Sequence, residues 1–122
     1  MDIYRELILD HYKHPHNFGH LSKPTATHTL FNSACGDKIT MEIQVDKKDI
    51  VTDIQFSGEG CAISQASASM LTDLVKGKTK KEILKLTSAD IFSLLNTELS
   101  VSRVKCAVLP LEVLQKAVTS TV

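Results

Sequence analysis

The chain has 122 residues, 43% of them hydrophobic and 23% charged, which suits a single domain over residues 1–122 that folds without disulfide bonds. Fourteen basic residues balance fourteen acidic ones, and no basic block is interleaved with aromatic residues, so nucleic acid is not an expected partner. The charged amino terminus and the lack of a long apolar run predict neither a signal peptide nor a membrane span, and three widely spaced cysteines indicate a reducing, cytoplasmic location.

The amino-terminal segment predicts an amphipathic helix. Apolar residues recur at helical spacing between Ile3 and Tyr12, and Asp2 is suited to cap the helix. His14-Pro15 is expected to end it, because proline cannot continue the helical hydrogen bonds.

Three strands are expected next. Residues 25–31 are rich in threonine and alternate in character, which favours a strand. Residues 38–46 and 50–56 alternate strictly between apolar and polar, and a polar turn separates them. They therefore predict an antiparallel hairpin with one buried face and one solvent-exposed face, and Glu42 belongs to the exposed face.

The second half of the chain has helical periodicity. Gly58 and Gly60 are interpreted as turn residues, and the helix after them is expected to stop at Gly77. Thr79 and Glu82 have the spacing of a capping box that starts a short helix. Ser88 is expected to cap another helix that runs through residue 95.

Pro110 constrains the start of the last helix. Proline is tolerated in the first helical turn, so this helix is expected to begin between Ala107 and Pro110, with Cys106 at its cap. In total the pattern predicts an α/β (α+β) domain with a three-stranded antiparallel sheet and about five helices.

The three cysteines all fall at predicted ends of elements. Cys35 stands in a turn between strands, Cys61 at the start of a helix, and Cys106 at the start of the last helix. Helix amino termini stabilise thiolates, and Arg103 and Lys105 favour the same charge state at Cys106.

Asp37 adds a carboxylate two residues after Cys35, which makes four candidate ligands with Cys61 and Cys106. Such a set suits a tetrahedral zinc site or an iron-sulfur cluster with one oxygen ligand. The alternative is that each cysteine is a small buried apolar residue, and the spacing alone does not decide between these interpretations. The five histidines show no paired ligand spacing and are interpreted as packed or solvated.

Several segments, in the same order along the chain, resemble the NifU amino-terminal domain family, whose members include the IscU and SufU proteins of iron-sulfur cluster assembly. The segments that carry the resemblance are Asp10-His11-Tyr12-Lys13, Pro15 with Asn17 and Gly19, residues 32–37, Phe56-Ser57-Gly58-Glu59-Gly60-Cys61-Ala62-Ile63-Ser64, Ala66-Ser67-Ala68-Ser69-Met70 and Arg103-Val104-Lys105-Cys106-Ala107. The resemblance extends over nearly the whole chain.

The resemblance implies a small antiparallel sheet covered by helices, with Cys35, Asp37, Cys61 and Cys106 together at one exposed end as ligands of a metal or a cluster. It further implies that the protein accepts sulfur from a cysteine desulfurase, assembles a transient [2Fe-2S] cluster from iron and sulfur, and passes it to apo-proteins. Cys106 is then the expected persulfide acceptor. In the SufU branch the same ligands hold zinc, the protein relays sulfur, and Cys35 is the expected acceptor.

Two departures bear on the choice of branch. Lys105 stands where IscU proteins have histidine, which resembles SufU, whereas the stretch between Cys61 and Cys106 is as short as in IscU. A protonated lysine is a poor ligand, so Asp37 is the expected fourth ligand. The motif Leu-Pro-Pro-Val-Lys of IscU is replaced by residues 99–105, which argues against a dedicated Hsp70 chaperone partner.

Overall fold

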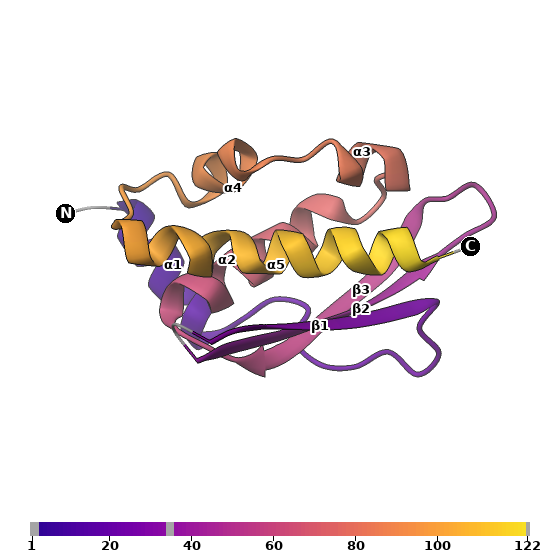
Figure 1. Cartoon of the computed structure of the whole chain (residues 1–122), viewed down its shortest axis with the longest axis horizontal. Helices are drawn as coiled ribbons and strands as arrows, with labels where there is room; N and C mark the ends of the chain where they lie inside the picture. The colour runs from indigo at the N-terminus through magenta and orange to yellow at the C-terminus, as the bar shows by residue number, and fades with distance from the viewer. Residues whose placement is uncertain (1–2, 34–35, 122) are drawn as a thin grey trace.

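The computed structural model describes residues 3–33 and 36–121, which form three strands and five helices (Figure 1). In chain order the elements are α1 (Ile3–Lys13), β1 (Ala26–Asn32), β2 (Asp37–Val45), β3 (Val51–Glu59), α2 (Ala62–Val75), α3 (Lys80–Leu84), α4 (Ser88–Leu95) and α5 (Val101–Ser120). The predicted fold class is confirmed. No helix in the described ranges is both long enough and apolar enough to cross a membrane.

The three strands form one antiparallel sheet in the order β1-β2-β3, and the helices lie on one side of it (Figure 1). The predicted hairpin is confirmed, because β2 pairs with β3 and its alternating residues Ile39, Met41 and Ile43 are fully buried. Each such side chain contributes roughly 1.5–3 kcal/mol by leaving water. The sheet face toward the helices therefore forms half of the core.

Helix α2 passes through the centre of the molecule and is buried on most sides. Small residues make this possible, since Ala66, Ala68 and Ser69 let neighbouring elements approach closely. The hydroxyl of Ser67 donates a hydrogen bond of 2.6 Å to the carbonyl oxygen of Ala107 in α5. This bond fixes α2 against the helix that carries the third cysteine.

The predicted start of the last helix is wrong. Helix α5 begins at Val101, with Ser100 as its N-cap, and Pro110 lies in its interior. Pro110 has no N–H to donate to the carbonyl four residues earlier, yet the helix continues because its inner face is buried against the sheet and α2. Cys106 therefore lies inside the helix and not at its cap.

The prediction for Glu42 is also wrong, because this side chain is only 7% exposed. Residues 17–25 lead from β3, where Asn17 and Gly19 bond to the backbone of Phe56, to the start of β1, and His20 and Leu21 in this segment contact Glu42. One carboxylate oxygen of Glu42 lies 2.6 Å from Nδ1 of His20, and the other accepts a hydrogen bond from the backbone N–H of Leu21. A segment distant in sequence thus buries a residue that the alternating pattern assigns to solvent.

The predicted helix ends are largely confirmed. Thr79 caps α3 through a capping box with Glu82, and α1 ends just before His14-Pro15. Helix α4 starts one residue earlier than expected, with Thr87 as its N-cap in place of Ser88. The predicted cap of the first helix, Asp2, lies outside the described residues.

Helix α1 buries only Ile8 and His11 and exposes its other apolar residues, which are Ile3, Tyr4, Leu7, Leu9 and Tyr12.

A polar network fastens α1 and the following loop to α2. Nδ1 of the buried His11 lies 2.6 Å from the hydroxyl of Ser69, and Nδ1 of His16 lies 2.5 Å from a carboxylate oxygen of Asp73. Asn17 donates a further hydrogen bond to the other oxygen of Asp73. The two imidazole rings are 4.5 Å apart between centroids. Protonation of both histidines would place two like charges side by side.

The pKa of His11 lies below its ordinary value, first because burial disfavours the charged form and then because His16 is close, while Asp73 and Asp10 oppose the shift. Below pH 6.5 the unfolded chain therefore binds more protons at this position than the folded protein does. We expect the stability from neutral His11 to be present above that pH and lost as the pH falls through the folded pKa. Urea unfolding at pH 7.5 and 5.5 should show a smaller pH dependence in His11→Asn, whereas the exposed-site control His14→Asn should behave as wild type.

Candidate metal centre

The candidate metal centre lies at one end of the sheet, where three elements meet. Asp37 is the first residue of β2, and Cys61 stands between the end of β3 and the start of α2, with Gly60 between it and the strand. The pairing of Lys38 with Glu59 brings these two strand ends side by side. Helix α5 packs across β1 and β2 and supplies Cys106. The ligand atoms of Asp37, Cys61 and Cys106 all lie within 4.8 Å of one another.

The carboxylate of Asp37 is the most informative group in this cluster because it is 1% exposed. Its Oδ1 accepts a hydrogen bond of 3.0 Å from the backbone N–H of Cys61. Its Oδ2 is buried and has no hydrogen-bond partner among the described residues. A buried carboxylate oxygen without a partner is unfavourable by about 1–3 kcal/mol or more, so a cation at this position would remove a cost that the fold otherwise bears.

Cys61 is the N-cap of α2, as the sequence predicts. The backbone N–H of Ser64 donates to its Sγ at 3.5 Å. Burial and the nearby charge of Asp37 act to raise the pKa of the Cys61 thiol, but hydrogen bonding with the backbone N–H and the side chain of Ser64, and with Cys106, has the larger combined effect. The pKa of Cys61 is therefore lowered, which favours the thiolate that binds metals.

Cys106 is fully buried, and its Sγ lies 3.8 Å from the carbonyl oxygen of Ser102 one turn earlier in α5. Helix α5 begins at Val101, more than one turn before Cys106, so the helix dipole does not stabilise a thiolate at Cys106 as the sequence predicts. The predicted cation is present: the pKa of the Arg103 guanidinium is raised, chiefly by charge attraction to Cys61 and then by hydrogen bonds to Cys61 and Cys106. Arg103 thus interacts with both sulfurs.

Gly60 provides the space for this cluster, a role that its interpretation as a turn residue missed. A Cβ atom at this position would lie 2.3 Å from the hydroxyl of Ser64 and 2.8 Å from Oδ1 of Asp37. Any side chain would push the carboxylate away from the N–H of Cys61. The order Gly60-Cys61 is therefore a spatial requirement of the centre and not only a feature of the turn.

The remaining predicted site residues are separate from this cluster or outside the described ranges. Cys35 lies outside the described residues. Lys105 is exposed and lines a different hollow of about 270 Å³ with Phe31. Three of the histidines have partners elsewhere, as described above, and within residues 3–33 and 36–121 the cluster of Asp37, Cys61 and Cys106 is the one group of three or more metal-ligating side chains.

The donor set fits a transition metal or an iron-sulfur cluster. Two sulfur donors and one carboxylate oxygen match zinc, iron and cluster chemistry, whereas calcium and magnesium prefer oxygen ligands alone. Three ligands leave at least one coordination position for a further donor or for sulfur. The fold and this site are those of a small antiparallel-sheet domain with a candidate metal centre that includes two cysteines.

The sequence model of the family described as "NifU-like N terminal domain" matches residues 3–121, and the chain belongs to this family. The zinc-dependent sulfurtransferase SufU of Bacillus subtilis (strain 168) is 37% identical, over 95% of this chain and 89% of its own length. The iron-sulfur cluster assembly scaffold protein IscU of Streptococcus pyogenes serotype M1 is 47% identical, over 75% of this chain and 55% of its length. IscU of Haemophilus influenzae is 34% identical, over 94% of this chain and 92% of its own length.

Solved structures have the same fold. A candidate iron-sulfur cluster assembly scaffold protein for the SUF system (FiSufU) from Fervidobacterium islandicum AW-1 superposes with a TM-score of 0.82 at 29% identity, over 93% of this chain and 94% of that one. The amino-terminal NifU-like protein from Brucella abortus gives a TM-score of 0.77 at 21% identity, over 96% and 92%, a likeness of fold alone.

Proposed function

We propose that this protein is an iron-sulfur cluster assembly scaffold that accepts sulfur from a cysteine desulfurase, binds iron, holds a transient [2Fe-2S] cluster and transfers it to apo-proteins. The observation that carries the proposal is the gathering of Asp37, Cys61 and Cys106 around a buried carboxylate oxygen that has no partner among the described residues. Membership of the NifU-like family and the IscU relatives support it.

We propose Cys35 as the remaining ligand. It stands two residues before Asp37 in the sequence, and Gly36 between them has a φ of +73°, a conformation that favours glycine. Three thiolates and one carboxylate complete a four-ligand set. The carboxylate is harder than a thiolate and exchanges more readily, which suits a cluster that must leave.

Zinc-dependent sulfur transfer is the second candidate function, and two observations favour it. The SufU relative covers nearly the whole of both chains, and Lys105 directly precedes Cys106. In this alternative the same four residues hold zinc and Cys35 accepts the persulfide sulfur, whereas in the scaffold Cys106 is the acceptor. Arg103 and Lys105 are the two cations that stand close to Cys106 in the sequence, and Arg103 interacts with the sulfurs of both Cys61 and Cys106, which favours the thiolate form at each.

Anaerobic reconstitution decides between the two functions. The protein is incubated with iron, cysteine and a desulfurase, its visible spectrum is recorded, and an apo-ferredoxin is added. We expect iron-sulfur absorption that then moves to the ferredoxin. A protein that stays colourless, retains zinc and accelerates desulfurase turnover would be a sulfur relay and would contradict the scaffold.

Lys105→His should strengthen retention of the iron-sulfur cluster if the protein is a scaffold. Lys105 precedes Cys106 in the sequence and lines a hollow with Ser33, two residues before Cys35. An imidazole there offers a ligand that a protonated lysine does not, so the reconstituted cluster should persist longer after chelator is added. Desulfurase turnover should stay unchanged. Lys116→His is a matched control because Lys116 lies farther along the same helix, outside the residues assigned to the centre. Equal cluster lifetimes in both variants would contradict this prediction.

A further inference from the structure

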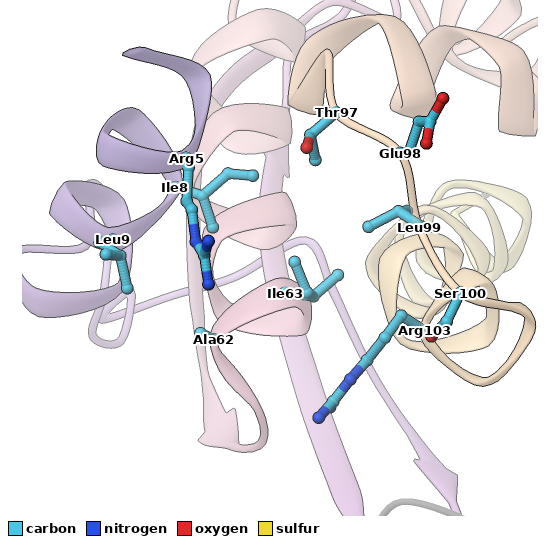
Figure 2. A pocket seen from close by; sticks show the side chains of 10 residues that line it. All are labelled: Arg5, Ile8, Leu9, Ala62, Ile63, Thr97, Glu98, Leu99, Ser100 and Arg103. Atoms are coloured by element: carbon cyan, nitrogen blue, oxygen red, sulfur yellow. The ribbon is translucent and has the colours of Figure 1, made fainter. Parts of the chain in front are cut away.

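A pocket of about 420 Å³ opens beside the candidate metal centre, bounded by three segments that are distant in sequence (Figure 2). Helix α1 forms one wall, the first residues of α2 form the base, and the segment that leads into α5 forms the opposite wall. Apolar side chains of Ile8, Ile63 and Leu99 line part of it. The volume is within the roughly 300–1,000 Å³ of ordinary small-molecule sites.

Two arginines give this pocket its charge. Arg5 belongs to α1 and Arg103 to α5, on opposite sides of the pocket; the Arg103 guanidinium is directed toward the start of α2, and the carboxylate of Glu98 points away from both guanidinium groups (Figure 2). The hydroxyl groups of Thr97 and Ser100 also belong to the lining. Arginine recognises carboxylates through paired donors, so the complementary ligand carries carboxylate groups and a short apolar portion.

The pocket adjoins the sulfur atoms of the metal centre. Ala62 lines the pocket and directly follows Cys61 in the chain. Arg103 lines the pocket and also interacts with the sulfurs of Cys61 and Cys106. A ligand held by the arginines therefore has one end close to the cysteines. A thiol at that end of the ligand could exchange sulfur with the cysteines.

We propose that this pocket binds a small thiol bearing carboxylate groups, of the size of a short peptide, with its sulfur directed toward the cysteines of the candidate metal centre. The inference rests on the proposed function and extends it by naming a class of sulfur acceptor in addition to protein partners. We choose this ligand class because the pocket offers arginines that recognise carboxylates, and because it adjoins reactive sulfur atoms.

The transfer step is redox-neutral. The bound thiolate attacks the terminal sulfur of a protein persulfide at the centre, a new sulfur–sulfur bond forms between them, and the sulfur–sulfur bond to the protein cysteine breaks. The cysteine leaves as a thiolate and takes up the proton that the attacking thiol released. The products are a small-molecule persulfide and the regenerated cysteine, and no outside oxidant or reductant takes part.

Binding is tested with S-methylglutathione, which has the carboxylates of a peptide thiol but no reactive sulfur. Titration into the metal-free, ¹⁵N-labelled full chain should shift the amide resonances of Ile63, Leu99 and Arg103. Arg5→Met should weaken binding at least 5-fold, and Arg5→Lys should weaken it less. Glu98→Gln should tighten binding about 2-fold by removing a negative charge from the rim. Lys13→Met, on the same helix outside the pocket, should leave the affinity unchanged.

Three results of the titration would overturn the proposal: no shifts at millimolar S-methylglutathione, shifts located elsewhere, or equal affinity for acetate, which would make the pocket a general anion site. Melting temperatures of all variants are compared with wild type. If Arg5→Met unfolds the chain, Arg5→Lys and Glu98→Gln still decide the question, because they predict opposite changes in affinity.

Transfer is tested with protein that a desulfurase has loaded with persulfide. The single-turnover rate should saturate with glutathione, whereas it should rise linearly with the neutral thiol β-mercaptoethanol. Arg5→Met should abolish saturation and Lys13→Met should retain it. Equal rates for the two thiols at the same thiolate concentration would overturn the proposal. If the desulfurase does not load the protein, the proposed function fails, while the titration still decides whether the pocket binds the ligand.

Discussion

Asp37→Asn is expected to lower zinc affinity by about 100-fold or more while leaving the metal-free protein folded. Structural zinc sites contribute about 10–16 kcal/mol through four ligands, so one ligand accounts for roughly 3 kcal/mol. Asparagine keeps an oxygen for the N–H of Cys61 but replaces the anionic Oδ2 by a neutral amide, which is a poor ligand. Affinity is measured by competition with a chromophoric chelator.

The stability of metal-free Asp37→Asn distinguishes a functional ligand from a structural one. A neutral amide is buried at lower cost than a carboxylate, so the unfolding free energy should change by no more than about 1 kcal/mol. Glu59→Gln is the matched control, because Glu59 is an exposed carboxylate two residues before Cys61. If Asp37→Asn binds zinc as tightly as wild type, Asp37 is not a ligand. If the metal-free variant unfolds, the main role of the Asp37 carboxylate is to stabilise the fold.

Gly58→Ala is expected to destabilise the fold by about 3 kcal/mol or more. Gly58 has a φ of +134°, and a Cβ there would lie 1.9 Å from the carbonyl oxygen of Lys38 in the neighbouring strand. The clash is with backbone, which cannot rotate away as a flexible side chain could. Backbone strain and overpacking each contribute about 1–3 kcal/mol. Urea unfolding at equilibrium gives the free-energy change.

Gly77→Ala is the control for Gly58→Ala. Gly77 also has a positive φ, +85°, but a Cβ at this position meets nothing within 4 Å. It should therefore show only the conformational cost of about 1–2 kcal/mol. The difference between the two variants isolates the close approach of β2 and β3 beside Asp37 and Cys61. Equal destabilisation would contradict the assignment of a steric role to Gly58.

The predictions that depend on local pattern agree best with the structure. A period of two is enough to place the hairpin and its buried face, and a glycine-rich turn before a helical pattern is enough to place Cys61 at a helix cap. The gathering of Asp37, Cys61 and Cys106 could not be predicted from spacing, because packing of α5 across the sheet determines it. The resemblance to a known family supplied that expectation.

The predictions that failed depend on tertiary contacts. Glu42 is buried by a loop from another part of the chain, and the alternating pattern carries no information about that loop. The pattern predicts Pro110 in a first helical turn, but burial along α5 outweighs the loss of one hydrogen bond. The pocket with Arg5 and Arg103 lies between segments that are distant in sequence, so no local signal in the chain identifies it.

The interior proline of α5 has a mechanical consequence for the centre. A helix that lacks one backbone hydrogen bond bends more easily at that point than on either side. Pro110 sets this point one turn beyond Cys106, while Val113 and Leu114 beyond it are fully buried in the core. When a sulfur atom or a metal is added at Cys106, the exposed first turn of α5, residues 101–103, can shift to accommodate the added volume while Ser67 holds Ala107 against α2. The core half of the helix then stays in place, so cargo of different sizes strains the fold little.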